Sequence, residues 1–184
     1  MGICKPPERV KLICGMLTAN KSLFDISCSF LARRLGEIDF ISQDFPFDST
    51  AYYNEELGEP IWRRFVSFRK VIFPDALAQI KLFSNQIERA LSSNGKRRIN
   101  LDPGLLSENS INLASTKENP FRLYLGKEIY AGLTLTFAKG RFLEHPWTYP
   151  DFRKPATKNI LAKIRKIYLN QRKAKNKKGT GSPR

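Results

Sequence analysis

The sequence has few of the residues that build metal centres and cysteine- or histidine-based active sites. His145 is its only histidine, and the three cysteines, Cys4, Cys14 and Cys28, form no Cys-x-x-Cys pair. A lone histidine predicts no metal cluster, and the chain shows no Cys-His spacing or Ser-His signature of nucleophilic catalysis. We interpret His145, which precedes a proline, as a loop residue.

Disulfides and long apolar runs are also missing. Three cysteines cannot all pair, and a chain of 184 residues buries enough surface to fold without a stabilising disulfide or metal ion. Cys14 and Cys28 lie among apolar residues, which is typical of buried thiols in a reducing compartment. No window approaches the roughly 18 apolar residues of a spanning helix. The early prolines and charges argue against an export signal, so we expect a soluble cytoplasmic protein.

Acidic residues are absent from the end of the chain. Asp151 is the last of the 17 acids, and 12 of the 32 Lys and Arg residues follow it. Most of the net charge of +15 therefore belongs to a cationic C-terminal arm. We expect residues 1–171 to form a single α+β domain and residues 172–184 to form a basic, disordered tail.

The body alternates strand-like and helical patterns in the order strand-helix-strand-strand-helix-strand. A β-meander and a final helix follow. This order predicts an α+β fold with a mixed or mostly antiparallel sheet and helices packed on it, whose first part resembles a ferredoxin-like arrangement. The main predicted elements are strands at 10–17, 61–72 and 97–102 and helices at 22–35, 74–94 and from 157.

A short alternating run ends in an acid at Asp102. Pro103 and Gly104 follow, and this pair fits the centre of a type II turn, so the strand is predicted to stop there and present Asp102 at the rim of the sheet. There Asp102 would accept a proton or hold a divalent cation with Asp48. The alternative is that Asp102 caps its own turn through a local hydrogen bond.

Other polar residues at strand ends and loops are candidates for the same rim, since binding residues concentrate in loops. Lys117 would meet a phosphate as a point charge, or is simply a solvated lysine, and no glycine-rich loop marks a P-loop. Tyr52 and Tyr53 would stack on or hydrogen-bond a ligand, but as neighbours they point apart, so one belongs to the core. The predicted ligand-binding residues are Asp48, Tyr52, Tyr53, Asn100, Asp102, Ser115, Thr116, Lys117 and Tyr149.

The sequence resembles an uncharacterised bacterial and archaeal family, the domain of unknown function 4416. The family's hallmark is an Asn-Leu-Asp-Pro-Gly motif, which here occupies residues 100–104. The resemblance covers most of residues 1–151 and implies no reaction or cofactor. Its other segments are Val10-Lys11-Leu12, Gly15-Met16-Leu17, Phe45-Pro46-Phe47-Asp48, Tyr52-Tyr53, Ala114-Ser115-Thr116-Lys117, Tyr124-Leu125-Gly126-Lys127, Ile129-Tyr130 and Pro146-Trp147-Thr148-Tyr149-Pro150-Asp151.

Two functions follow from these features. The body is predicted to bind a small anionic ligand, such as a phosphorylated compound or a nucleotide, and whether it is an enzyme is left open. The alternative is association with RNA through the basic C-terminal helix and tail, without sequence preference. The residues predicted for that contact are Lys163, Arg165, Lys166, Arg172, Lys173, Lys175, Lys177 and Lys178.

Overall fold

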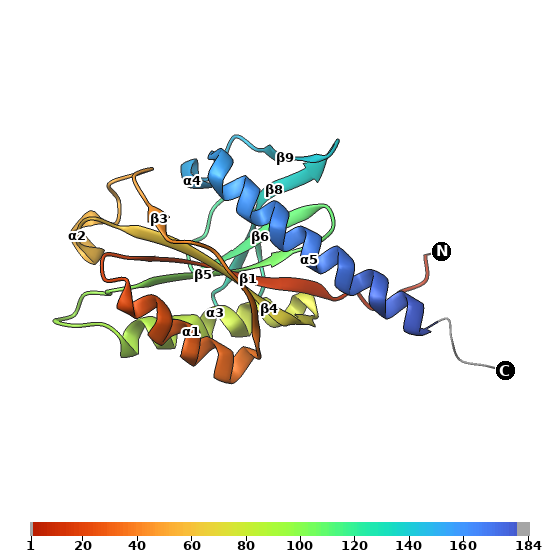
Figure 1. Ribbon diagram of the computed structural model, residues 1–184, viewed down its shortest axis with the longest axis horizontal. Coiled ribbons are helices and arrows are strands. Elements are labelled where there is room, and N and C mark those ends of the chain that lie inside the picture. The colour runs from red at the N-terminus through yellow and green to blue at the C-terminus, as the bar shows by residue number, and fades with distance from the viewer. Residues whose placement is uncertain (1, 180–184) are drawn as a thin grey trace.

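The computed structural model describes the backbone of residues 2–179 and the side chains of residues 2–174 (Figure 1). In this part of the chain one antiparallel sheet of nine strands runs in the order β2-β4-β1-β5-β6-β8-β7, with β3 paired to β4 and β9 to β8. The elements are β1 Val10–Thr18, α1 Ser22–Leu35, β2 Ile38–Ile41, β3 Phe45–Pro46, α2 Asn54–Leu57, β4 Trp62–Ile72, η1 Pro74–Ala76, α3 Leu77–Ala90, β5 Asn100–Leu106, β6 Ser110–Ser115, β7 Arg122–Tyr124, β8 Tyr130–Ala138, β9 Arg141–Glu144, α4 Pro150–Arg153 and α5 Pro155–Gly179.

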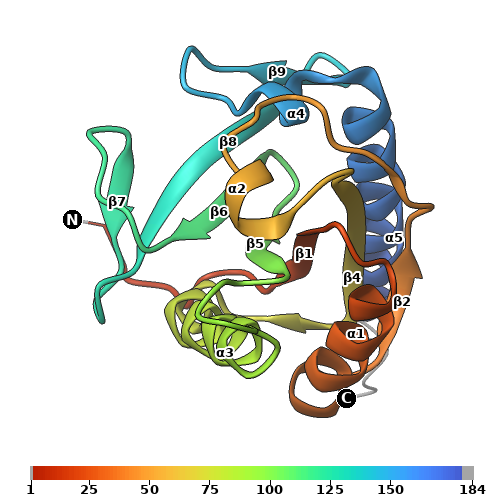
Figure 2. The ribbon, with the colours of Figure 1, turned by 90° about the vertical axis from the view of Figure 1, so that its left-hand side faces the viewer.

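Strand β1 is the centre of the fold, and all nine of its residues are buried. Successive side chains point to opposite faces, so the strand supplies two cores. Leu12 and Met16 pack with residues of α1 and α3, whereas Ile13 packs with residues of α5. Helices α1 and α3 cover one face of the sheet and α5 covers the other (Figures 1 and 2). The predicted α+β class, with helices packed on an antiparallel sheet, is thereby confirmed. The ferredoxin-like start stays a prediction.

Helix α5 crosses the second face of the sheet. Leu161, Ile164 and Tyr168 are almost fully buried and pack with Phe65 of β4 and Phe152 of α4. The predicted final helix is therefore present, but it begins at 155 and continues to 179. It passes residue 172, where the tail was predicted to begin. The rest of that predicted tail, residues 180–184, lies outside the described residues.

The predicted turn at Pro103-Gly104 is wrong, because β5 continues through both residues to Leu106. Pro103 pairs with Cys14 of β1, but the pairing of β5 with β6 starts only at Gly104. A proline is tolerated where one side of a strand has no partner. Gly104 serves a close approach rather than a turn, because a Cβ there would lie 2.8 Å from the carbonyl oxygen of Asn112.

Among the helices of the described residues, none combines the length and the apolar composition needed to cross a membrane.

Candidate functional site

A cavity of about 550 Å³ opens at the end of the sheet where β5 and β6 separate. The two strands pair from Gly104 to Leu106 on β5, whereas Ala114 and Ser115 of β6 pair only with β8. Residues 100–103 therefore have no neighbouring strand on that side. Eight of the nine predicted ligand-binding residues line the cavity, namely Tyr52, Tyr53, Asn100, Asp102, Ser115, Thr116, Lys117 and Tyr149.

Helix α3 satisfies the backbone of β5 that β6 leaves free. Glu88 accepts a hydrogen bond of 2.6 Å from the backbone N–H of Leu101, and Lys81 donates one of 2.7 Å to its carbonyl oxygen. Both side chains are buried and line the cavity, and their charged ends lie 3.9 Å apart. Burial raises the pKa of Glu88, while the charge of Lys81 opposes the rise. These two residues therefore pair both backbone polar groups of Leu101, where β6 provides no partner.

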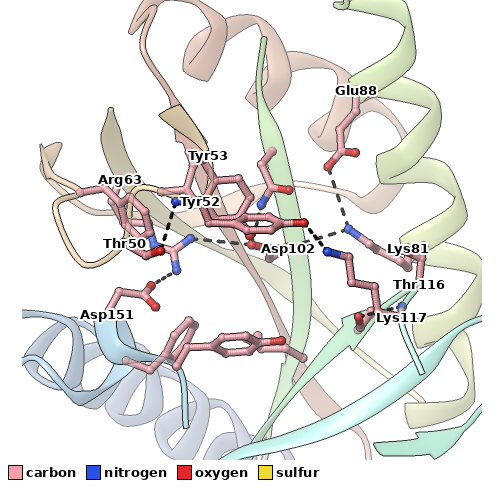
Figure 3. A pocket seen from close by; sticks show the side chains of 18 of the residues that line it. Thr50, Tyr52, Tyr53, Arg63, Lys81, Glu88, Asp102, Thr116, Lys117 and Asp151 are labelled. Atoms are coloured by element: carbon pink, nitrogen blue, oxygen red, sulfur yellow. Dashed lines mark hydrogen bonds and ion pairs between the residues drawn. The ribbon is translucent and has the colours of Figure 1, made fainter. Parts of the chain in front are cut away.

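Arg63 reaches across β1 from the opposite side. Its side chain is 3% exposed, forms an ion pair with Asp151, and places Nη1 3.8 Å from Asp102 Oδ2 (Figure 3). Gly15 lies between Phe65 and Asp102 in the sheet register, and a Cβ there would stand 3.2 Å from Arg63 Nη1. The glycine therefore leaves room for the guanidinium. Arg63 Nε and Nη1 have no hydrogen-bond partner among the described residues.

Asp102 stands between the two buried cations (Figure 3). Its Oδ1 lies 3.8 Å from Lys81 Nζ, and its Oδ2 lies 3.8 Å from Arg63 Nη1. Asn100 donates a hydrogen bond of 2.6 Å to Oδ2, and Asn100 in turn accepts one of 2.9 Å from Arg97. The predicted alternative, a local turn closed by Asp102, does not occur. Its side chain is 25% exposed, so the carboxylate is accessible from the cavity.

A chain of polar contacts forms the rim of the cavity. The ammonium of Lys117 donates to the Tyr52 hydroxyl and lies 4.6 Å from the centre of that ring. Arg122 donates to Ser115 Oγ at 2.8 Å and to the Tyr149 hydroxyl at 2.6 Å. Lys117 is exposed, so both interpretations of it stand, and its contact with Tyr52 joins the β6 side of the cavity to the loop that carries Tyr52.

The adjacent tyrosines have different environments, as predicted, but the prediction that they point apart is wrong, because their rings meet edge to face with centroids 5.0 Å apart. Tyr52 is 63% exposed, whereas Tyr53 packs against a small core of Leu17, Phe47 and neighbouring residues. Burial raises the pKa of Tyr53, and the negative charge of Asp102 raises it further. Tyr53 therefore presents a neutral hydroxyl to the cavity.

Asp48 and His145 do not line this cavity. Asp48 is exposed and paired with Lys154, whose positive charge lowers the pKa of the carboxyl. The predicted pairing of Asp48 with Asp102 around a cation is therefore not assembled. His145 is a loop residue, as predicted, with Nε2 2.8 Å from Thr136 Oγ1 and its ring stacked on Trp147. Among the described residues, no group of three or more His, Cys, Asp and Glu side chains is placed to hold a metal ion.

The residues predicted for RNA contact lie along α5 and differ in their contacts. Arg165 donates to the backbone of Glu108, and Arg172 pairs with the carboxylate of the same residue. Lys163, Lys166 and Lys173 are exposed. The side chains of Lys175, Lys177 and Lys178 lie outside the described part.

Sequence reasoning missed the buried charged residues of the site. Arg63 lies on β4 and Arg97 precedes β5, and β1 separates these two strands, so nothing in the sequence marks the two arginines as parts of one site. Lys81 and Glu88 lie beside the apolar residues of α3, and charged residues at such positions are usually interpreted as part of the solvent-exposed face of a helix. The one available signal was their seven-residue spacing, which places both on the same helical face.

The comparisons with known proteins agree with the family resemblance. A protein-family model described as domain of unknown function DUF4416 matches residues 8–168. No curated protein and no solved structure matches the chain. The match covers the sheet, α1 to α4 and every cavity residue named above, and it ends within α5.

Proposed function

The chain belongs to the DUF4416 family, and we propose that its cavity binds a small anionic ligand carrying a phosphate group. The observation that carries the proposal is Arg63, a buried guanidinium at the cavity wall with two nitrogens that bond to no described residue. A buried unpaired donor is costly unless a bound group compensates it. Both nitrogens are enclosed, so an anion in the cavity would act on them through its charge and add to the attraction of Asp102, which lies 3.8 Å from Nη1.

The charges of the lining favour an anion. Three acids, Glu88, Asp102 and Asp151, face five bases, of which Arg97 is also paired with Glu56 outside the lining. The acids are each within 4 Å of a buried base, whereas the ammonium of Lys117 at the rim bonds, among the described residues, only to a neutral hydroxyl. The bases lining the cavity are Arg63, Lys81, Arg97, Lys117 and Arg122. An excess of positive charge in a partly desolvated site attracts and holds phosphate.

The size and the aromatic walls fit a small organic molecule rather than a macromolecule. A volume of about 550 Å³ lies within the range of small-molecule sites. Tyr52, Tyr53 and Tyr149 present both ring surfaces and hydroxyl groups at the lining. Such side chains orient a ligand that has apolar faces and polar edges.

Replacing Lys117 with methionine tests the proposal. We expect the unchanged protein to bind ribose 5-phosphate in isothermal titration calorimetry at low salt, and the Lys117→Met variant to bind it at least about tenfold more weakly, the usual loss for a charge-assisted hydrogen bond. Lys70→Met is the matched control, because Lys70 is exposed on β4 and does not line the cavity. Absence of binding to any phosphate compound, or equal affinity in Lys117→Met, would contradict the proposal.

We also propose that the protein works in a reducing compartment such as the cytoplasm. Cys14 and Cys28 are buried free thiols, as predicted, and Cys4 is an exposed free thiol. Burial raises the pKa of both buried thiols, which keeps them protonated and unreactive.

Association with RNA is a second candidate, favoured by three lysines that remain exposed along α5 while neighbouring arginines are paired. We expect a variant with Lys163→Ala, Lys166→Ala and Lys173→Ala to bind single-stranded RNA less tightly, and its log K to fall less steeply with log salt by up to about 2, at about 0.7 per lost phosphate contact. Filter binding across a series of salt concentrations measures both the affinity for RNA and its salt dependence. A variant carrying Lys70→Ala, Lys127→Ala and Lys139→Ala loses the same charge elsewhere, and an equal effect in the two would rule out α5 as the binding surface.

A further inference from the structure

The acid at the centre of the cavity needs an explanation if the ligand is an anion. Asp102 lies between Arg63 and Lys81 at 3.8 Å from each, a separation that allows attraction but no direct hydrogen bond. Its only hydrogen-bond donor among the described side chains is Asn100, which bonds to Oδ2. Oδ1 therefore has no donor from the described residues, although it belongs to a side chain accessible from the cavity.

A ligand that is only an anion fits this arrangement poorly. It would bring negative charge toward the carboxylate of Asp102 and would leave Oδ1 without a donor. A ligand with hydroxyl groups would instead donate to Oδ1, and hydrogen bonds to a carboxylate are stronger than those between neutral groups. The acid thus selects for a donor attached to the anion.

The surroundings of Asp102 contain other groups suited to hydroxyls. The Tyr53 hydroxyl forms no hydrogen bond with a described residue, and Tyr53 lines the same cavity. Thr50, Asn85 and Thr116 add further uncharged polar side chains to the lining. These groups both donate and accept, so they match the hydroxyls of a sugar better than a bare anion.

We propose that the ligand is a phosphate ester of a hydroxylated sugar, such as ribose, with the 2-hydroxyl of the sugar donating to Asp102 Oδ1 and the phosphate bound near Lys117. This inference rests on the proposed function. Asp102 comes from β5 and Lys117 follows β6, so the two groups stand on the two strands between which the cavity opens. The separated strands therefore supply one polar anchor each.

The test compares ribose 5-phosphate with 2-deoxyribose 5-phosphate, and adenosine monophosphate with its 2′-deoxy form, by isothermal titration calorimetry. We expect each deoxy compound to bind the full chain at least about tenfold more weakly, the loss expected for one hydrogen bond to a charged group. In Asp102→Asn we expect the phosphate to bind still, but the preference within each pair to fall to about threefold or less. A preference for the hydroxylated member of each pair supports the sugar hydroxyl. Tighter binding of adenosine monophosphate than of ribose 5-phosphate would in addition identify the base as part of the ligand.

The outcomes separate the two levels of the proposal. If all four compounds bind but the deoxy forms bind equally well, the 2-hydroxyl is ruled out as the donor to Asp102 and the anion site remains. If none binds, the proposed function fails with it. Asp75→Asn, an exposed acid on η1 outside the cavity, is the matched control and must keep the preference of the unchanged protein. The comparison of compounds on the unchanged chain needs no variant, so it decides the question even if Asp102→Asn folds poorly.

Discussion

Replacing Arg63 with methionine is expected to lower the free energy of unfolding by about 3–5 kcal/mol, the usual cost of removing one partner of a buried ion pair. The side chain of Arg63 is 3% exposed, and the change leaves the buried carboxylate of Asp151 without its cation. It also removes a guanidinium that lies 4.8 Å from the ring centre of Phe65 in the core beneath α5. Urea unfolding followed by circular dichroism measures the loss.

A second arginine of β4 provides the control for this prediction. Arg69 pairs with Glu37, but both side chains are more than half exposed, so Arg69→Met should cost less than about 1 kcal/mol. Combining Arg63→Met with Asp151→Leu should recover most of the loss, since an apolar pair often replaces a buried ion pair at little cost. Similar losses for Arg63→Met and Arg69→Met would show that burial is not the cause.

From the sequence, many of the residues that line the cavity could be predicted, but the buried charges that determine its chemistry could not. Tyr52, Asp102, Lys117 and Tyr149 were grouped only because each follows or ends an element, and the fold brings all four to one cavity. This worked for Tyr52, Lys117 and Tyr149 because binding residues concentrate in loops that a rigid scaffold positions, whereas Asp102 lies within β5 near its start. Asp48 satisfied the same local criterion, but the charge of Lys154, 106 residues later in the chain, holds it outside.

The buried charges were not predictable from local patterns. Arg63 reaches Asp102 only because β1 lies between β4 and β5 and carries Gly15 at the crossing point. Lys81 and Glu88 bond to the backbone of Leu101, which is free to accept them because β6 pairs with β5 only from Gly104 to Leu106. Strand order and strand separation are long-range properties, and no periodicity within one element encodes them.

For the motif Asn-Leu-Asp-Pro-Gly, a local rule predicted the wrong structural element but pointed to the place where the cavity begins. Pro103 and Gly104 were interpreted as a turn because their conformational preferences fit one. In the structure Pro103 occupies the segment of β5 that lacks β6, and Gly104 allows the close approach at which β6 begins to pair. The two residues therefore mark the point where the strands separate, which is also where the cavity begins.

Replacing Glu88 with alanine is also expected to destabilise the protein strongly. We expect Glu88→Ala to lower the free energy of unfolding by about 3 kcal/mol or more. The variant leaves the N–H of Leu101 without an acceptor and removes the acid beside Lys81 and Arg97. An unsatisfied buried donor and an uncompensated buried cation each destabilise a fold. Urea unfolding at neutral pH measures the change, and a loss below about 1 kcal/mol would mean that water replaces the carboxylate.

The variant Glu88→Gln separates shape from charge, because the amide oxygen can still accept from Leu101. Burial raises the pKa of Glu88, so the folded protein holds this proton more tightly than the unfolded chain does. The stability that protonation contributes is fully present below the ordinary glutamate value of 4.5 and is lost as pH rises through the folded pKa. The stability of Glu88→Gln lacks this dependence, so its difference from the unchanged protein should shift in favour of Glu88→Gln as pH rises from 4 to 7. A difference that is constant or moves the other way would show that the pairing with Lys81 and Arg97 outweighs desolvation.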